Sequence, residues 1–308
     1  MPATEPPPNA TLIDPRLGAA PEAGTLDPAL LADLARRALA EDGAFQDVTT
    51  AATVEPWQRG TGTVLAKAEG VLAGLPVMAA VFAEVDAQLA FTPLRLDGER
   101  VRRGDRIATI EGCFAAMLRG ERTALNLLQR LSGVATAAAR AVAAVEGLPV
   151  RIVDTRKTTP GLRALEKYAV RAGGGHNHRF NLTDGVLVKD NHLAALRSRG
   201  LGIADAVRLA RQRAPHTLRV ELEVTTLAEL DEALAAGAEI ILLDNMPAAE
   251  MAEAVRRSRG RALTEASGGI TPDTARAAAE TGVDLISLGA LTHSAPALDI
   301  SLELALAD

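Results

Sequence analysis

Residues 151–192 decide the fold, and they read RIVDTRKTTPGLRALEKYAVRAGGGHNHRFNLTDGVLVKDNH. The stretch contains eight Lys/Arg and four Asp/Glu, a net charge of +4 within a chain whose net charge is −6. Basic groups concentrated in an acidic protein indicate a small anionic ligand. A nucleic-acid duplex would be repelled by the remaining surface, so we expect no nucleic-acid partner.

From this stretch to the C-terminus, short apolar strands alternate with helical segments. Such alternation predicts a parallel sheet with helices outside it. Six strand–helix units favour a short barrel over the full eightfold form. The six predicted strands are residues 150–154, 185–189, 219–224, 239–244, 261–265 and 284–289.

The part of the chain before this stretch has a different pattern. Asp27 followed by Pro28 is a helix start, and Gly43 is a helix end. Residues 61–112 read as strand, helix and further strands, which predicts a small antiparallel sheet with helices on one face. Residues 114–147 read as two helices separated at Ser132-Gly133.

The fold class is therefore α/β, with a small antiparallel N-terminal sheet followed by a short parallel α/β barrel. Six of the sixteen prolines fall in residues 1–24, which predicts a flexible tail. The predicted domains are residues 1–24 (tail), 25–133 (N-terminal domain), 134–290 (barrel) and 291–308 (a segment returning to the N-terminal domain).

The composition excludes several classes of protein. The 48% apolar and 23% charged content is typical of soluble globular proteins. Seven aromatic residues are too few for binding single strands by base stacking. Cys113 is the only cysteine, so no intrachain disulfide can form. Apolar runs are too short to span a bilayer and no secretory signal is visible, so we expect a cytoplasmic protein without a membrane partner.

Charged groups and glycine loops follow nearly every barrel strand. In a barrel, the carboxyl ends of the strands form the functional face. The residues at these ends are Asp154 with Thr155, Arg156 and Lys157, then Lys189, Glu223, Asp244, the loop Ser267-Gly268-Gly269, and Gly289 with His293. Apolar strands ending at random would not be followed so regularly by such groups.

The last two loops indicate a phosphate site. Gly268 and Gly269 precede a helix with Thr271 as N-cap and Pro272 at its first position. The free N–H groups and the helix dipole there suit an anion. Phosphates commonly bind in barrels at the loops after the final two strands.

Two acids on successive strands need a separate explanation. Glu223 and Asp244 at a phosphate-binding mouth suit magnesium, held directly or through its waters. They could equally pair with Lys189 or Arg156. Glu221 points to the same face as Glu223, and spacing alone gives it no role.

The histidines of the central stretch are poor candidates for metal ligands. No acid or cysteine lies at ligand spacing beside His176 and His178, so a zinc site is not expected. His178, next to Arg179, is better suited to donate a hydrogen bond to a carboxylate ligand. These features together predict one phosphorylated ligand with magnesium and one small polyanion held by arginines.

Several motifs make the chain resemble the quinolinate phosphoribosyltransferases, also called carboxylating nicotinate-nucleotide pyrophosphorylases. The motifs are DTRKTTPGLRALEKYAVRAGGGHNHRFNL (154–182), LVKDNH (187–192), ELEV (221–224), ILLDN (241–245), EASGGI (265–270) and LGALTHSAPALDISL (288–302). The resemblance implies transfer of phosphoribosyl from phosphoribosyl pyrophosphate to quinolinate, giving nicotinate mononucleotide, pyrophosphate and carbon dioxide for NAD synthesis. It also implies that the N-terminal domain is an α/β open sandwich joined to an incomplete parallel α/β barrel, and that the chain forms a homodimer or a larger assembly.

The resemblance also implies roles for individual residues. Quinolinate would be held by Arg156, His178, Arg179 and Lys189, with Arg122 contributed by the partner subunit and Thr155 also at the substrate. Lys157, Glu223 and Asp244 would be catalytic, facing the ribose, the pyrophosphate and magnesium. Phosphate would be bound by Ser267, Gly268, Gly269, Gly289 and His293. Many members have Glu-Val-Glu where this chain has Glu221-Leu222-Glu223, an apolar exchange.

Two alternatives remain at this point. A phosphoribosyltransferase for nicotinate would need fewer cations than this chain offers, and carbon dioxide release separates the two enzymes. A ligand-binding barrel without catalysis should depart from the family at residues 177–179 and 189–192, which are intact here.

Overall fold

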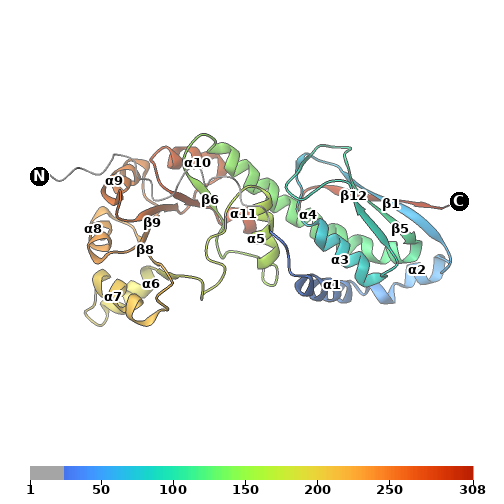
Figure 1. Ribbon diagram of the computed structural model, residues 1–308, viewed down its shortest axis with the longest axis horizontal. Coiled ribbons are helices and arrows are strands. Elements are labelled where there is room, and N and C mark those ends of the chain that lie inside the picture. The colour runs from blue at the N-terminus through green and yellow to red at the C-terminus, as the bar shows by residue number, and fades with distance from the viewer. Residues whose placement is uncertain (1–23, 308) are drawn as a thin grey trace, which may run out of the picture. The chain divides into compact units, whose positions relative to one another are not determined.

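The computed structural model describes residues 24–307, which form two compact units (Figure 1). We name them the sandwich unit (residues 24–139, 157–175 and 290–307) and the barrel unit (residues 140–156 and 176–289). The predicted tail lies outside the described residues, apart from residue 24. Each unit is made of several separate segments of the chain, whereas each predicted domain is one continuous range. The predicted domain boundaries therefore stay predictions.

The sandwich unit is built on an antiparallel sheet with the strand order β12-β1-β5-β3. β1 lies between β12 and β5, with Gly60 opposite Leu306 and Ala66 opposite Ile300. Its elements are α1 (Pro28–Asp42), η2 (Ala44–Gln46), α2 (Val48–Thr53), β1 (Arg59–Ala66), β2 (Gly70–Val71), α3 (Leu75–Val85), β3 (Ala90–Pro93), β4 (Arg100–Val101), β5 (Arg106–Cys113), α5 (Arg163–Ala172), α11 (Ala290–His293) and β12 (Ile300–Leu306), together with most of α4 (Phe114–Ala144).

Local signals in the sequence set the start and end of α1 as predicted. The Asp27 carboxylate accepts a hydrogen bond from the Ala29 amide at 2.9 Å, and Pro28 occupies the first helical position. Gly43 ends the helix at a φ of 66°, a left-handed conformation that glycine adopts without steric penalty.

The predicted break at Ser132-Gly133 is wrong, because α4 runs through it without interruption. A Cβ atom at Gly133 would lie 2.0 Å from the carbonyl oxygen of Pro296. The glycine therefore allows the chain near Pro296 to pack directly against the helix backbone. Two neighbouring contacts hold the same segment: the Leu298 amide donates to the Gln129 carbonyl at 3.0 Å, and the Gln129 side chain donates to the Ile300 carbonyl at 2.6 Å.

The barrel unit contains a six-stranded sheet with the order β6-β11-β10-β9-β8-β7, in which every neighbouring pair of strands is parallel. All six predicted strands are present, and the predicted α/β class is confirmed. The elements are β6 (Arg151–Val153), β7 (Val186–Val188), α6 (Asp190–Arg197), α7 (Ile203–Arg213), β8 (Val220–Val224), α8 (Leu227–Ala236), β9 (Ile240–Asp244), α9 (Ala248–Ser258), β10 (Leu263–Ser267), α10 (Pro272–Ala279) and β11 (Leu285–Ser287).

The two faces of this parallel sheet differ in chemistry. Leu222, Ile241, Leu243, Ala266 and Ile286 are fully buried and alternate along their strands with residues of the opposite face. That opposite face carries the acids Glu221, Glu223, Asp244 and Glu265, because side chains two residues apart on a strand share a face. Among residues 24–307, no helix has both the length and the apolar character needed to cross a membrane.

Candidate active site

The carboxyl ends of β7 to β10 bring predicted residues together. Ser267 lies directly opposite Asp244 in the register, and Glu223 is opposite Leu242, two residues before Asp244. The Lys189 ammonium, just after β7, contacts a Glu223 carboxylate oxygen at 2.6 Å. Pairing of an acid with Lys189 was one of the two explanations left open by the sequence, and it applies to Glu223.

The loop of residues 176–179 is held by a buried acid at the end of β6. Asp154 is fully buried and accepts hydrogen bonds from the Asn177 side chain at 2.7 Å and from the His178 amide at 2.9 Å. Its own amide donates to the His176 carbonyl at 3.1 Å. Asp154 therefore fixes the backbone that carries His178 and Arg179.

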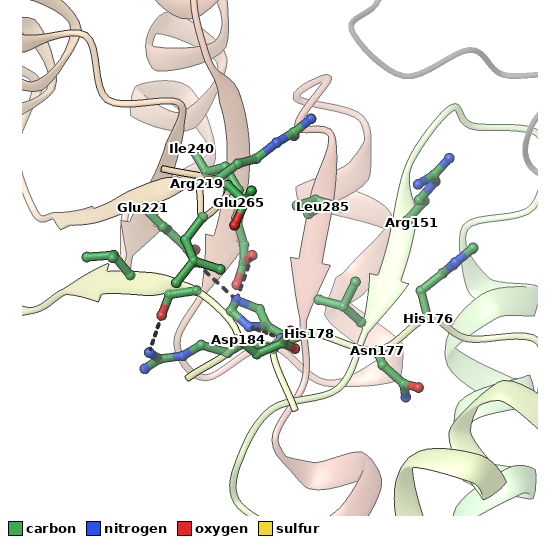
Figure 2. A pocket seen from close by; sticks show the side chains of 16 residues that line it. Arg151, His176, Asn177, His178, Asp184, Arg219, Glu221, Ile240, Glu265 and Leu285 are labelled. Atoms are coloured by element: carbon green, nitrogen blue, oxygen red, sulfur yellow. Dashed lines mark hydrogen bonds and ion pairs between the residues drawn. The ribbon is translucent and has the colours of Figure 1, made fainter. Parts of the chain in front are cut away.

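His178 points into the barrel unit between two buried acids (Figure 2). Its Nε2 lies 3.4 Å from Glu221 and 3.3 Å from Glu265, whose side chains are 7% and 1% exposed. Burial by itself lowers the pKa of His178, but the hydrogen bonds and charges of the two glutamates outweigh it and raise that pKa to about 10. Burial raises the pKa of Glu221, and the hydrogen bond from His178 opposes the rise.

The second ring nitrogen of His178 also has a partner in the chain. Nδ1 accepts a hydrogen bond from the Arg179 amide at 2.8 Å. Since Nδ1 accepts, the ring proton of this conformation lies on Nε2 and faces the glutamates. Full protonation requires Nδ1 to give up the Arg179 amide, and it would leave an Nδ1–H that can donate to a ligand.

His178, Glu221 and Glu265 are also close enough together to be tested as metal ligands. A metal-bound imidazole nitrogen must carry no proton. Nε2 carries the proton while Nδ1 accepts from Arg179, so this arrangement is a hydrogen-bonded cluster and we assign no metal to it.

Two arginines of the site influence each other. Burial and the positive charge of Arg156 lower the pKa of Arg179, which places both guanidinium groups in the same electrostatic environment. One Arg179 guanidinium nitrogen donates to the Gly185 carbonyl at 3.2 Å. Together with His178, they form the basic side of the site, and His178 itself lies between the acids of β8 and β10.

A cavity of about 440 Å³ borders this cluster. His178, Arg179, Glu221 and Glu265 line it, and Figure 2 shows the His178 ring directed between the two glutamates. Further lining residues include Arg151, Arg219, Ile240 and Leu285, which lie at or next to the amino ends of their strands. The cavity therefore extends from the acid–histidine cluster towards that end of the sheet.

The predicted glycine loop, residues 267–269, adopts a backbone conformation that glycine adopts more easily than other residues. Gly268 has a φ of 94°, and a Cβ there would lie 2.3 Å from the Asn245 side chain. Asn245 is held in turn, because its amide donates to the Ser267 carbonyl at 2.9 Å. α10 begins at Pro272 as predicted, with Thr271 as N-cap.

The remaining predicted residues divide between the two units. Thr155 is half-buried after β6, and Gly289 is half-buried after β11, both in the barrel unit. Arg122, Lys157 and His293 belong to the sandwich unit, where each side chain is exposed. The Lys157 carbonyl accepts a hydrogen bond from the Thr292 hydroxyl at 2.8 Å, and His293 Nδ1 lies 2.6 Å from the Ser294 hydroxyl.

Three residues that organise the site were given no role by the sequence analysis: Asp154, which it named only as a strand-end residue, Glu221, which it placed only on the face of Glu223, and Glu265. Strand alternation contained the signal for two of them, since Glu221 and Glu265 each lie two residues before a predicted site residue on the same strand. Asp154 stands at a strand end, but its hydrogen bonds to the following loop depend on tertiary structure.

Comparisons with known proteins agree on one family. The C-terminal and N-terminal domain models of quinolinate phosphoribosyl transferase match residues 134–303 and 47–132. A probable nicotinate-nucleotide pyrophosphorylase [carboxylating] of Bacillus subtilis is 46% identical, over 80% of this chain and 83% of its own. The Mycobacterium leprae protein named nicotinate-nucleotide pyrophosphorylase [carboxylating] is 45% identical, over 88% and 96%. The solved structure of NadC from Streptococcus pyogenes covers 92% of this chain and 100% of its own, at 42% identity and a TM-score of 0.88.

Proposed function

The chain belongs to the quinolinate phosphoribosyltransferase family, and on that premise we propose how its residues perform the family's reaction. The enzyme transfers phosphoribosyl from phosphoribosyl pyrophosphate to quinolinate and releases pyrophosphate and carbon dioxide. The product is nicotinate mononucleotide, an intermediate of NAD synthesis. One observation supports the assignment most: Arg156, His178, Arg179 and Lys189 are gathered in the barrel unit, beside the acids of β8.

Quinolinate carries two carboxylates, and the basic side of the site suits a dianion. Guanidinium groups bind carboxylates through paired hydrogen bonds, which fix both the position and the orientation of the ring. We assign Arg156 and Arg179 to this role, with Lys189 and His178 as further donors and Thr155 at the edge of the same site. His178 would donate from Nδ1 once that nitrogen is protonated and released from the Arg179 amide.

The phosphoribosyl donor requires a second set of contacts. We assign the phosphate groups to Ser267, Gly268, Gly269, Gly289 and His293, because the glycine loop before α10 presents backbone N–H groups and a helix N-terminus. Lys157 would neutralise the departing pyrophosphate. Glu223 and Asp244 supply the oxygen ligands that magnesium prefers, and they would hold it directly or through its waters. When bound, magnesium adds positive charge beside the pyrophosphate.

The bond changes follow from this arrangement. The bond between the anomeric carbon and the pyrophosphate oxygen breaks, and the ribose becomes oxocarbenium-like while the leaving group takes the electron pair. The pyridine nitrogen then forms the new bond to the anomeric carbon. Its positive charge lets the ring accept the electron pair released when the adjacent carboxylate leaves as carbon dioxide, and a proton from solvent completes the product. Positioning and preorganised charge are the main sources of rate enhancement.

The test of the reaction uses the purified full chain. Incubation with quinolinate, phosphoribosyl pyrophosphate and magnesium should yield nicotinate mononucleotide with one carbon dioxide per turnover. Nicotinate in place of quinolinate serves as the control and should give little product. Turnover of nicotinate without carbon dioxide release would contradict the assignment.

We further propose a homodimer in which Arg122 reaches the site of the partner subunit, without limiting the assembly to two chains. Arg122 is exposed on α4, which leaves it available for such a contact. The Arg122→Ala and Arg156→Ala variants should each be inactive alone. Mixing them after subunit exchange should restore about a quarter of wild-type activity, because half of the dimers then contain one intact site. No recovery in mixed dimers verified by mass would contradict the shared site.

A further inference from the structure

A buried ion pair in the sandwich unit joins α4 to α5. Arg130 donates to one Glu166 carboxylate oxygen from Nη2 at 2.7 Å and from Nε at 3.2 Å. The Glu166 side chain is fully buried, and that of Arg130 is 25% exposed. Desolvation offsets most of the attraction in such pairs, so a pair of this kind is better explained by the geometry it fixes than by stability.

Both members of the pair make hydrogen bonds to two other segments of the chain. Glu166 accepts from the Thr159 amide at 3.0 Å and from the Thr159 hydroxyl at 2.7 Å. Arg130 donates to the Ala295 carbonyl at 2.9 Å and to the Thr292 carbonyl. The loop after β6, and the end of α11 together with the residues that follow it, are therefore held by one ion pair.

Thr292 connects these two segments directly. Its side chain is fully buried, and its hydroxyl donates to the Lys157 carbonyl at 2.8 Å. Lys157 and His293, which lie on the two segments, have exposed side chains. The main chain next to each of these two side chains is therefore held by buried groups of the sandwich unit, while the side chains themselves are exposed.

We propose that Arg130, Glu166 and Thr292 are positioning residues that set Lys157 and His293 for binding the pyrophosphate part of the donor. This inference rests on the proposed function, which assigns both residues to phosphoribosyl pyrophosphate. A displacement of about 1 Å in such groups is enough to slow a reaction strongly, because charge must be in place as the leaving group departs.

The test removes the hydroxyl of Thr292 while keeping the shape of the side chain. Thr292→Val should raise the KM for phosphoribosyl pyrophosphate about five- to tenfold, the range expected for one lost hydrogen bond. The KM for quinolinate should change less than about twofold. Thr292→Ser retains the hydroxyl and should restore wild-type values. Thr136→Val is the matched control, since it removes a hydroxyl from α4 that contacts Val71 and not Lys157.

Calorimetric titration with inorganic pyrophosphate and magnesium gives a readout independent of turnover. Thr292→Val should weaken pyrophosphate binding by the same factor and leave quinolinate binding unchanged. Should that variant fail to fold, Thr159→Val removes a hydrogen bond to Glu166 and should shift the same constant in the same direction.

Equal pyrophosphate affinity in wild type and a folded variant would overturn the positioning role. So would equal losses of affinity for pyrophosphate and quinolinate. If the wild type itself fails to convert quinolinate, the proposed function fails, and the pyrophosphate titration still tests the positioning role.

Discussion

The two larger sheets within residues 24–307 use their buried faces for different purposes. The antiparallel sheet of the sandwich unit directs Val64, Ile107 and Ile110 into an apolar core, and all three are fully buried. The parallel sheet of the barrel unit buries Glu221 and Glu265 on the face opposite its helices. In a parallel sheet all carboxyl ends meet at one edge, which gathers functional groups, whereas antiparallel strands divide their ends between two edges.

The largest expected effect falls on the barrel unit and concerns activity alone. Arg156→Ala should lower kcat/KM for quinolinate on the order of 100- to 1,000-fold, because a preorganised charged contact is lost. The unfolding temperature should stay within a few degrees of wild type. Arg256→Ala is a control, since Arg256 is an exposed arginine of α9 whose side chain is 74% exposed. Near-normal activity of Arg156→Ala would contradict the proposal that the barrel unit binds quinolinate through Arg156.

The matching change in the sandwich unit should affect stability alone. Ile110→Ala should lower the free energy of unfolding by about 2–5 kcal/mol through lost burial and the resulting cavity. Ile110→Val should lower it by about 0.5–1.5 kcal/mol. Urea denaturation measures both, and kcat of the folded fraction should match wild type. A large fall in kcat for Ile110→Val would show that the core of the sandwich unit also affects activity and not stability alone.

The pH dependence of stability should come from the acid–histidine cluster of the barrel unit. His178 has a pKa of about 10 when folded and 6.5 as the ordinary value. A raised histidine pKa stabilises the folded state fully below pH 6.5, and this contribution is lost as pH rises towards 10. Wild type should therefore lose at most about 1.4 kcal/mol per pH unit in this window, relative to His178→Gln. Denaturation at pH 6, 8 and 10 tests it, and parallel curves for the two proteins would refute it.

The smallest effects are expected at helix caps, where the two units should not differ. Asp27 caps α1 in the sandwich unit, and Thr226 caps α8 in the barrel unit through the Glu229 amide at 3.2 Å. Alanine at either position should lower the free energy of unfolding by about 1 kcal/mol. Thermal unfolding of both variants measures the difference, and a much larger loss at one cap would show that the helices of the two units differ in local energetics.

The sequence predicted most of the regular structure, because strand–helix alternation and cap residues are local signals. The six barrel strands and the start of α1 at Pro28 follow from them. The break at Gly133 was wrong because a glycine within an apolar helix signals either a break or a close approach, and only the distant Pro296 decides between these. The sequence analysis did not predict α6, because it interpreted the KDNH motif (189–192) only as part of the site. The same motif also caps this helix: the Lys189 amide donates to the His192 ring at 3.0 Å.

The candidate site was predicted less completely than the fold. Residues at strand ends, such as Lys189 and Glu223, could be found because topology places them at one edge. The buried glutamates around His178 could not be assigned, since their partner comes from a loop more than 40 residues away in the chain. The cytoplasmic location and magnesium stay predictions.

The pairing of β1 with β12 has a consequence for biosynthesis. Seven residues of β1 find one of their two strand partners in β12, which is translated only after the segments of the barrel unit. Until β12 has been translated, that edge of the nascent sandwich has unpaired amide and carbonyl groups, which is the kind of surface that attracts foreign strands. The antiparallel sheet is therefore completed only after the barrel unit has been translated, and chaperone dependence should be concentrated in that interval.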